Sequence, residues 1–430
     1  MAKQTVRVLQ PTFYDKFSCT GPACPSNCCH SWNISVDKAS YLRCQSTDDH
    51  EIAEICKHAF ELCSDSPADE KRHALIKHNT DGMCPFLDAD NLCLLHKRLG
   101  AECLSVTCMA YPRTKNLWAQ GEGELSLYMS CYEAARLALY EQNETEFEIV
   151  DKQYDTDDHQ FRQKTGVFHL HESQKGYQDY AVQIRNTCID IMQSRQCTVS
   201  ERILVICMML QEITGLYADS YLEGIFPALE NYFSAVQNGE CSGVLGDFLY
   251  DEAAHLSSLR RSLIRVAFKK RESFAKDPSP IHDRFLQSLG LTPADTVETI
   301  EQKIINPVTP KFIAKGISEL CDPYFAANPT VLENYFVSYI FSSLFPFRLS
   351  SETLTPEQNG FILAEHYAMI RAMISGVAQH EGGITQEIVL RVISFLARGA
   401  QHSNSEDKLL ADYARSNRLD GLADAIYMLW

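Results

Sequence analysis

Beyond about residue 165, apolar residues recur at the three- and four-residue spacing that is typical of amphipathic helices. Proline-containing breakers such as Asn306-Pro307 and Asp322-Pro323 separate several of the periodic segments. No fixed-period repeat relates the segments to one another, so the pattern does not indicate a solenoid. The predicted helices cover residues 177–195, 200–218, 222–238, 245–275, 330–345, 357–379, 384–400 and 405–429.

The first 150 residues follow a different pattern, in which turn-rich segments alternate with short helices. Asp37 is placed to cap a helix that follows it, because an aspartate side chain accepts hydrogen bonds from the first free amides of a helix. Apolar residues over 50–62 have helical spacing, and a further helix is predicted to begin near Tyr132. The alternation over 147–149 allows a short strand.

Cysteine is distributed unevenly, since twelve of the 17 cysteines lie in residues 1–131. This asymmetry predicts a cysteine-rich metal or iron–sulfur module in residues 1–150 and a mainly helical body in residues 151–430 that contacts substrate or cofactor. The expected fold class is mainly α, with an irregular cysteine-rich N-terminal metal-binding module packed on an all-helical C-terminal body.

Composition narrows the class of protein. Hydrophobic residues make up 45% of the chain and charged residues 22%, which predicts a folded globular protein. The formal net charge of −17 argues against nucleic-acid binding, because neutralising phosphates requires a basic surface. We find no apolar run of about 18 residues and no signal-peptide core, and we therefore expect a cytoplasmic protein without a membrane span.

In the reducing cytoplasm, dense cysteine indicates metal or redox chemistry rather than a disulfide framework. The first cluster, Cys19, Cys24, Cys28 and Cys29, lies in FSCTGPACPSNCCHSW, whose glycine, proline and asparagine residues favour turns. Turns let the backbone fold round an ion and direct several sulfurs inward, and the thiolate is the form of cysteine that binds metals. We interpret this segment as binding a metal or a cluster.

The second group of cysteines begins with Cys84 and Cys93, which flank an Asp-Ala-Asp-Asn sequence. That sequence suits a tight turn between two short arms, which would bring the two cysteines together. Cys108 follows fifteen residues after Cys93. Cys131 lies at the start of a predicted helix, where the free backbone amides would favour a thiolate.

The spacing of the cysteines bears on which metal they hold. All-sulfur sites select zinc or iron–sulfur clusters. The repeated C-x2-C of a zinc ribbon is missing, which makes zinc the less favoured alternative, and C-x3-C-x2-C is missing too, because position 31 is Ser31. His30 and His96 lie near the cysteines and could substitute as ligands, although such histidines are more often ordinary polar neighbours.

Signatures of several common enzyme classes are missing from the sequence. There is no G-x-G-x-x-G after a strand, no P-loop and no H-E-x-x-H. If the protein uses S-adenosylmethionine, its sequence does not indicate the usual doubly wound cofactor fold.

Three sequence blocks together resemble the flagellin lysine-N-methylase family of bacteria. They are FSCTGPACPSNCCHSWNISVDKASY, MCPFLDADNLCLLHKRLGAECLSVTCMAYPR and ELSLYMSCYEAARLAL. The first two blocks also look like a broader set of small cysteine-cluster proteins. The resemblance covers the N-terminal third well and the C-terminal body more loosely, chiefly over 332–346.

The resemblance implies methyl transfer from S-adenosylmethionine to the ε-amine of surface lysines on flagellin, by an enzyme that carries a [4Fe-4S] cluster. One cubane needs four sulfurs, so the family's cysteine positions could also divide between a cluster and a structural site. Cys103 looks like an extra cysteine in this chain. The family's positions fall on Cys19, Cys24, Cys28, Cys29, Cys84, Cys93, Cys108 and Cys131.

Methylation of lysine requires a neutral amine, and the ordinary pKa of lysine is about 10.4, so the enzyme must desolvate the amine or offer a base. Tyr335 and Tyr339 share a face of one predicted helix with the spacing i, i+4, next to Asn334. A buried aromatic stripe explains the same pattern, and we assign no catalytic residue. Two other functions stay open from the sequence: a non-enzymatic iron–sulfur or zinc module for partner assembly, and an iron–sulfur redox protein.

Overall fold

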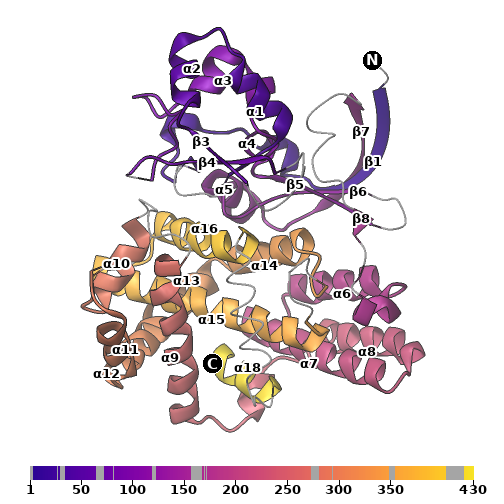
Figure 1. The fold of residues 1–430 in the computed structure, drawn as a ribbon. Coiled ribbons are helices and arrows are strands. Elements are labelled where there is room, and N and C mark those ends of the chain that lie inside the picture. Colours follow the sequence, from indigo (N-terminus) through magenta and orange to yellow (C-terminus); the bar gives the residue numbers. More distant parts are fainter. Residues whose placement is uncertain are drawn as a thin grey trace. The chain divides into compact units, whose positions relative to one another are not determined.

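The computed structural model shows a mainly helical protein whose described residues divide into two compact units (Figure 1). One unit is formed from Met1–Ala134 and Glu146–Phe168, and the other from Ala135–Thr145, His169–Ser273 and Pro280–Trp430. Each unit therefore draws on more than one stretch of the chain. The structure describes residues 3–26, 28–29, 34–63, 72–80, 82–118, 123–155, 167–168, 170, 172–272, 280–292, 294–347, 354–402 and 421–430.

A five-stranded mixed sheet in the order β7-β1-β6-β5-β8 lies in the N-terminal unit. β1 pairs antiparallel with β7 along its whole length and parallel with β6, where Val8 lies opposite Gly123. A Cβ atom at position 123 would lie 3.0 Å from Val8 Cγ1, so glycine permits this close pairing. The strands are β1 Lys3–Pro11, β5 Arg113–Trp118, β6 Gly123–Leu127, β7 Phe147–Asp155 and β8 Val167–Phe168.

A second, three-stranded sheet has the order β2-β4-β3. Its residues share one buried hydrophobic cluster with the short helices of the cysteine-rich region. Its strands are β2 Ser35–Val36, β3 Phe60–Leu62 and β4 Ala74–Ile76. The helices of this unit are α1 Lys38–Gln45, α2 His50–Cys56, α3 Leu94–Leu99 and α4 Val106–Ala110, and α5 Tyr132–Tyr140 begins in it.

Two predictions for this unit need correction. The prediction of an irregular module was wrong in omitting two sheets, whose pairings join segments far apart in the sequence. The helix predicted over 50–62 ends at Cys56, because Phe60–Leu62 instead pairs with Ala74–Ile76, which supplies its backbone hydrogen bonds. The cap at Asp37, the helix beginning at Tyr132 and the strand at Phe147 are confirmed.

The C-terminal unit is a helical assembly built around α15, Pro356–Glu381, which packs against α7, α9, α10, α12, α16 and α18. By length and composition α15 could cross a membrane, but its apolar stretch is wholly buried in the structure, as in the core helix of a globular unit. The helices before it are α6 Ala181–Gln193, α7 Val199–Ala218, α8 Ile225–Gln237, α9 Glu252–Glu272, α10 Pro280–Ser288, α11 Val297–Ile305, α12 Val308–Gly316, α13 Asp322–Ala327 and α14 Thr330–Ser342. Those after it are α16 Gln386–His402 and α18 Gly421–Leu429.

Each predicted helical segment of this unit contains a helix. In the last predicted segment, 405–429, the structure describes α18, whereas residues 405–420 lie outside the described residues. Helices α10 to α13 were not predicted. All four are short, and α10, α12 and α13 each contain a proline, a residue that weakens a helix prediction. The structure also joins Cys197 and Cys241 in a disulfide across the α7–α8 region, a pair that the expectation of reduced cysteines did not include.

Candidate metal centre

A cavity of about 410 Å³ lies within the N-terminal unit, and cysteine side chains make up much of its wall. Six of the eight predicted ligands line it, whereas Cys24 and Cys131 do not. Phe17, Phe60 and Phe86 contribute apolar surface between the sulfurs. The cysteines in the wall are Cys19, Cys28, Cys29, Cys44, Cys84, Cys93, Cys103 and Cys108.

The predicted turn between Cys84 and Cys93 is confirmed, and it brings the two arms together. Leu87 and Cys93 form an antiparallel bridge, and the amide of Asp88 donates to the carbonyl of Leu92 over 2.9 Å. The Asp88 carboxylate accepts from the amides of Asp90 and Leu92, both over 2.9 Å. An aspartate side chain that bonds amides two and four residues later stabilises such a turn, so the local sequence accounts for this arm of the cavity.

Two capped helices position another part of the cavity wall. The Asp37 carboxylate accepts from the amide of Ser40 at the start of α1 and from the amide of Val106 in α4. The hydroxyl of Ser105 caps α4 by accepting from the amide of Cys108 over 3.1 Å. Asp37 thereby joins α1 to α4 and fixes the helix that carries Cys108.

The sulfurs of the first and second cysteine groups lie close enough to interact electrostatically. Cys29 shares a thiol hydrogen bond with Cys28 and interacts with Cys84 and Cys108. Cys108 interacts in turn with Cys84, Cys93 and Cys28. The structure therefore brings together cysteines separated by up to about eighty positions in the sequence.

The two predicted ligands that do not line the cavity also lie near Cys28. Cys131 interacts electrostatically with Cys28 and Cys24, and Cys24 interacts with Cys28 and Cys19. All eight predicted positions thus belong to one connected group of thiols, although they do not all face one space.

Burial keeps the thiols of Cys84, Cys108 and Cys131 in the neutral form. It raises the pKa of Cys84 to about 12, and the pKa of Cys108 to about 12. At Cys131, burial raises the pKa to about 12, although backbone amides of Ala134 and Glu133 act in the opposite direction. The helix amides therefore lower the pKa of Cys131 as predicted, but burial raises it by more. A bound metal ion would reverse this balance by replacing the thiol protons.

Sequence reasoning missed three cysteines that belong to the same region. Cys44 and Cys103 line the cavity, although Cys103 was interpreted as an extra. Cys56 is buried and shares a thiol hydrogen bond with Cys44. No motif marks Cys44 or Cys56, because Cys44 lies in the last turn of α1, Cys56 ends α2, and each reads as a small apolar residue.

A cation and a histidine also line the cavity. The guanidinium of Arg113 lies 5.0 Å from the ring centroid of Phe17, and its Nη2 donates to the carbonyl of Phe17. His96, a candidate substitute ligand, lies in the wall as well. His30, the other candidate, lies outside the described residues. A cationic side chain suits a cavity that holds an anionic guest.

The thiols surround a space and do not meet at a point. Among the residues that the structure describes, no three histidine, cysteine, aspartate or glutamate side chains are arranged to hold a single metal ion. A polynuclear cluster separates its ligands by the width of its own core, whereas zinc draws four ligands to one atom. The cysteines and His96 in the cavity wall are ligand types that both zinc and iron–sulfur clusters use.

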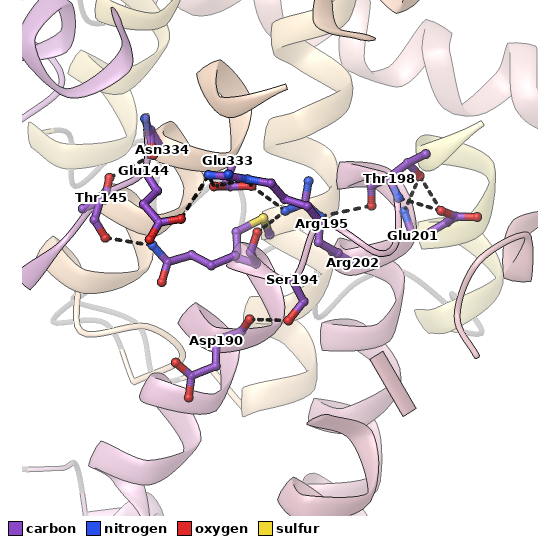
Figure 2. A network of polar contacts seen from close by, with 12 residues as sticks. Glu144, Thr145, Asp190, Ser194, Arg195, Thr198, Glu201, Arg202, Glu333 and Asn334 are labelled. Atoms are coloured by element: carbon purple, nitrogen blue, oxygen red, sulfur yellow. Dashed lines mark hydrogen bonds and ion pairs between the residues drawn. The ribbon is translucent and has the colours of Figure 1, made fainter. Parts of the chain in front are cut away.

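The C-terminal unit contains a polar network centred on Glu333, which has no exposed surface (Figure 2). The Glu333 carboxylate accepts from Nη2 of Arg195 over 2.7 Å and from Nη1 of Arg202 over 2.8 Å. Asn334, beside it on α14, accepts from the hydroxyl of Thr145 over 3.1 Å. Two arginines satisfy this buried carboxylate, and its ion pair with Arg202 ties α7 to α14.

The tyrosines singled out from the sequence lie in the core of the same unit. Tyr335 and Tyr339 are buried on α14, and the hydroxyl of Tyr335 lies 3.2 Å from Nε2 of His366 on α15. The ring centroids of Tyr339 and His366 are 5.3 Å apart. The buried aromatic stripe is confirmed as the arrangement of these residues, and no catalytic role is assigned to them.

The two units define a class of protein with a thiol-lined cavity in a mixed α/β unit and a separate helical unit. The helical unit matches the model of the FliB lysine N-methylase C-terminal domain over residues 185–428, so the chain belongs to the FliB lysine N-methylase family. The prediction of a protein-lysine N-methyltransferase is confirmed at the level of this family.

Comparison with individual proteins agrees with this family assignment. The chain is 22% identical over 409 residues to a lysine-N-methylase of Salmonella typhimurium, covering 93% of each protein, and equally similar to that of Salmonella choleraesuis. It is 34% identical over 134 residues to the flagellar biosynthetic protein FliU of Salmonella muenchen, covering 31% of this chain and 78% of that protein. No solved structure matches the chain.

Proposed function

We propose that the protein is an S-adenosylmethionine-dependent methyltransferase that methylates lysine side chains of flagellin and depends on a [4Fe-4S] cluster in its N-terminal unit. Family membership supports lysine methylation, and the flagellar name of one relative supports a flagellar substrate. The cysteine-lined cavity is the observation that supports the proposal of a cluster.

Four cysteines are the first choice as cluster ligands: Cys28, Cys29, Cys84 and Cys108. They line one cavity and interact with one another electrostatically. Cys19 and Cys93 also line the cavity and are the next choice, while Cys24 and Cys131 lie outside its wall. Arg113 would offset part of the negative charge that four thiolates and a cluster carry.

S-adenosylmethionine, when bound, supplies a methyl group on a positively charged sulfur. The lone pair of the lysine nitrogen forms the new N–C bond as the S–C bond breaks, and the sulfur leaves with that electron pair. The nitrogen must have lost a proton before the reaction, because a protonated amine has no lone pair. The protein must therefore receive that proton or exclude the water that stabilises the ammonium form.

Two measurements test this proposal. Anaerobically purified protein should be brown and contain iron and acid-labile sulfide in the ratio of a cubane; a colourless protein with stoichiometric zinc would contradict the cluster. Incubation with flagellin and S-adenosylmethionine should add methyl-group mass increments to flagellin, read by intact-protein mass spectrometry. Cluster-intact protein that leaves flagellin unmodified would contradict the methyl transfer.

A further inference from the structure

A long stretch of the helical unit carries negative charge alone. Between Arg202 and His255 the sequence has no lysine, arginine or histidine. Eight acidic side chains lie in this stretch, and all of them are exposed. They are Glu212, Asp219, Glu223, Glu230, Glu240, Asp247, Asp251 and Glu252.

Exposed aromatic side chains lie among these carboxylates where α7 leads into α8, two helices that pack against each other. Tyr221 is 52% exposed and Phe226 is 46% exposed. The Tyr221 ring covers Gly224, where a Cβ atom would lie 2.7 Å from a ring carbon, and the Phe226 ring lies 5.0 Å from that of Tyr180. Both rings are therefore held in place while much of their surface faces solvent.

Three carboxylates flank the two rings. Phe226 and Glu230 are four residues apart in α8 and share one side of the helix. Glu223 lies in the turn that leads into α8, and Asp219 is the C-cap residue that follows α7. We call Asp219, Tyr221, Glu223, Phe226 and Glu230 the acidic aromatic face.

The charge of this face is not balanced within the described part of the chain. Of the eight carboxylates in the stretch, Glu252 is the one for which the described residues provide an ion pair, with Lys311. Some acidic side chains elsewhere on the surface do have basic partners, as Glu54 has Lys57 and Glu387 has Arg391. The face therefore has an excess of negative charge around exposed rings.

We infer that the acidic aromatic face binds a lysine-bearing surface of the protein substrate. A lysine ammonium is attracted both to carboxylates and to the face of an aromatic ring, and its methylene stem packs on apolar surface. Charge of one sign over a wide area also speeds the encounter with a basic partner. This inference rests on the proposed function, because it takes the substrate of that reaction as the partner.

The test compares charge reversal at the face with charge reversal elsewhere. The variant Glu223→Lys/Glu230→Lys should bind monomeric flagellin and poly-L-lysine about tenfold more weakly at low salt, through slower association, and the difference should shrink in high salt. Phe226→Ala should weaken binding at both salt concentrations. Glu61→Lys/Glu301→Lys is the matched control, because both side chains are exposed and the change in net charge is the same.

Binding is measured by biolayer interferometry, and circular dichroism verifies that every variant is folded. Unchanged binding by the folded face variant, or an equal loss in the control, would overturn the inference. Methylation of flagellin by the wild-type protein is measured separately. If the wild type methylates flagellin while the face variants bind normally, the docking inference fails and the proposed function stands; if the face binds both probes but flagellin gains no methyl groups, the proposed function fails instead.

Discussion

The backbone amide of Cys84 donates a hydrogen bond to the carbonyl oxygen of Cys29 over 2.9 Å. This bond joins the end of the first cysteine cluster to the beginning of the second. Two sequence blocks that each carry turns and cysteines thereby form one wall of the cavity.

Replacing Cys84 with serine should reduce the iron content of the anaerobically purified protein, because a hydroxyl is a poor ligand for a cluster that thiolates hold. Iron and acid-labile sulfide are measured together with the visible absorption. Cys63→Ser is the control, since Cys63 follows β3 directly and lies outside the cavity wall. Full iron content in Cys84→Ser would remove Cys84 from the set of ligands.

Replacing Asp37 with alanine should destabilise the N-terminal unit by about 0.5–2 kcal/mol, because the first turn of α1 loses its cap. The change also removes the acceptor for the amide of Val106, so α4 should lose protection from hydrogen exchange. Asp37→Asn keeps an acceptor and should lose less. Chemical denaturation and hydrogen exchange measure both effects, and equal stability of Asp37→Ala and wild type would contradict the role of the cap.

Replacing Glu333 with leucine should destabilise the helical unit by about 3–5 kcal/mol, because it leaves the buried guanidinium of Arg202 without its counter-charge. Urea denaturation measures the loss. Glu387→Gln breaks an exposed pair with Arg391 and should cost about 0–1 kcal/mol. Similar losses in the two variants would show that burial does not set the strength of the Glu333 network.

Stability of the helical unit should fall as the solution becomes acidic, in part through His255. Burial lowers the pKa of His255, although its Nδ1 lies 3.0 Å from the carbonyl oxygen of Tyr427. An unfolded histidine has a pKa of about 6.5, so below that pH the unfolded chain binds a proton that the folded chain does not. This contribution is present above pH 6.5 or so and is lost as the pH falls toward the lowered folded pKa.

The variant His255→Asn tests this dependence, because asparagine does not titrate and can still donate to the Tyr427 carbonyl. The thermal midpoint should fall less steeply with acidification in the variant than in the wild type. Parallel curves for the two proteins would show that His255 does not contribute to the pH dependence.

Local chemistry determined several features of this protein from the sequence alone. Asp37 caps α1 and Asp88 shapes the turn before Cys93, because their side chains bond amides only a few residues away. Long apolar periodicity likewise predicts α7 and α15, because the spacing of apolar residues within one segment indicates a buried helix without reference to its partners. The concentration of cysteine in the N-terminal third is also visible without a structure.

Tertiary structure decided the features that depend on distant partners. Phe60–Leu62 forms a strand because β4 offers backbone groups to pair with, which overrides its helical spacing. Cys44 and Cys103 join the cavity wall, and Glu333 meets Arg202 across 131 positions, because packing of separate elements places them there. Sequence spacing carries no signal for such contacts, since their geometry follows from how whole helices and strands pack. The sequence therefore predicts the thiols and the helices, and the fold decides which thiols share one cavity.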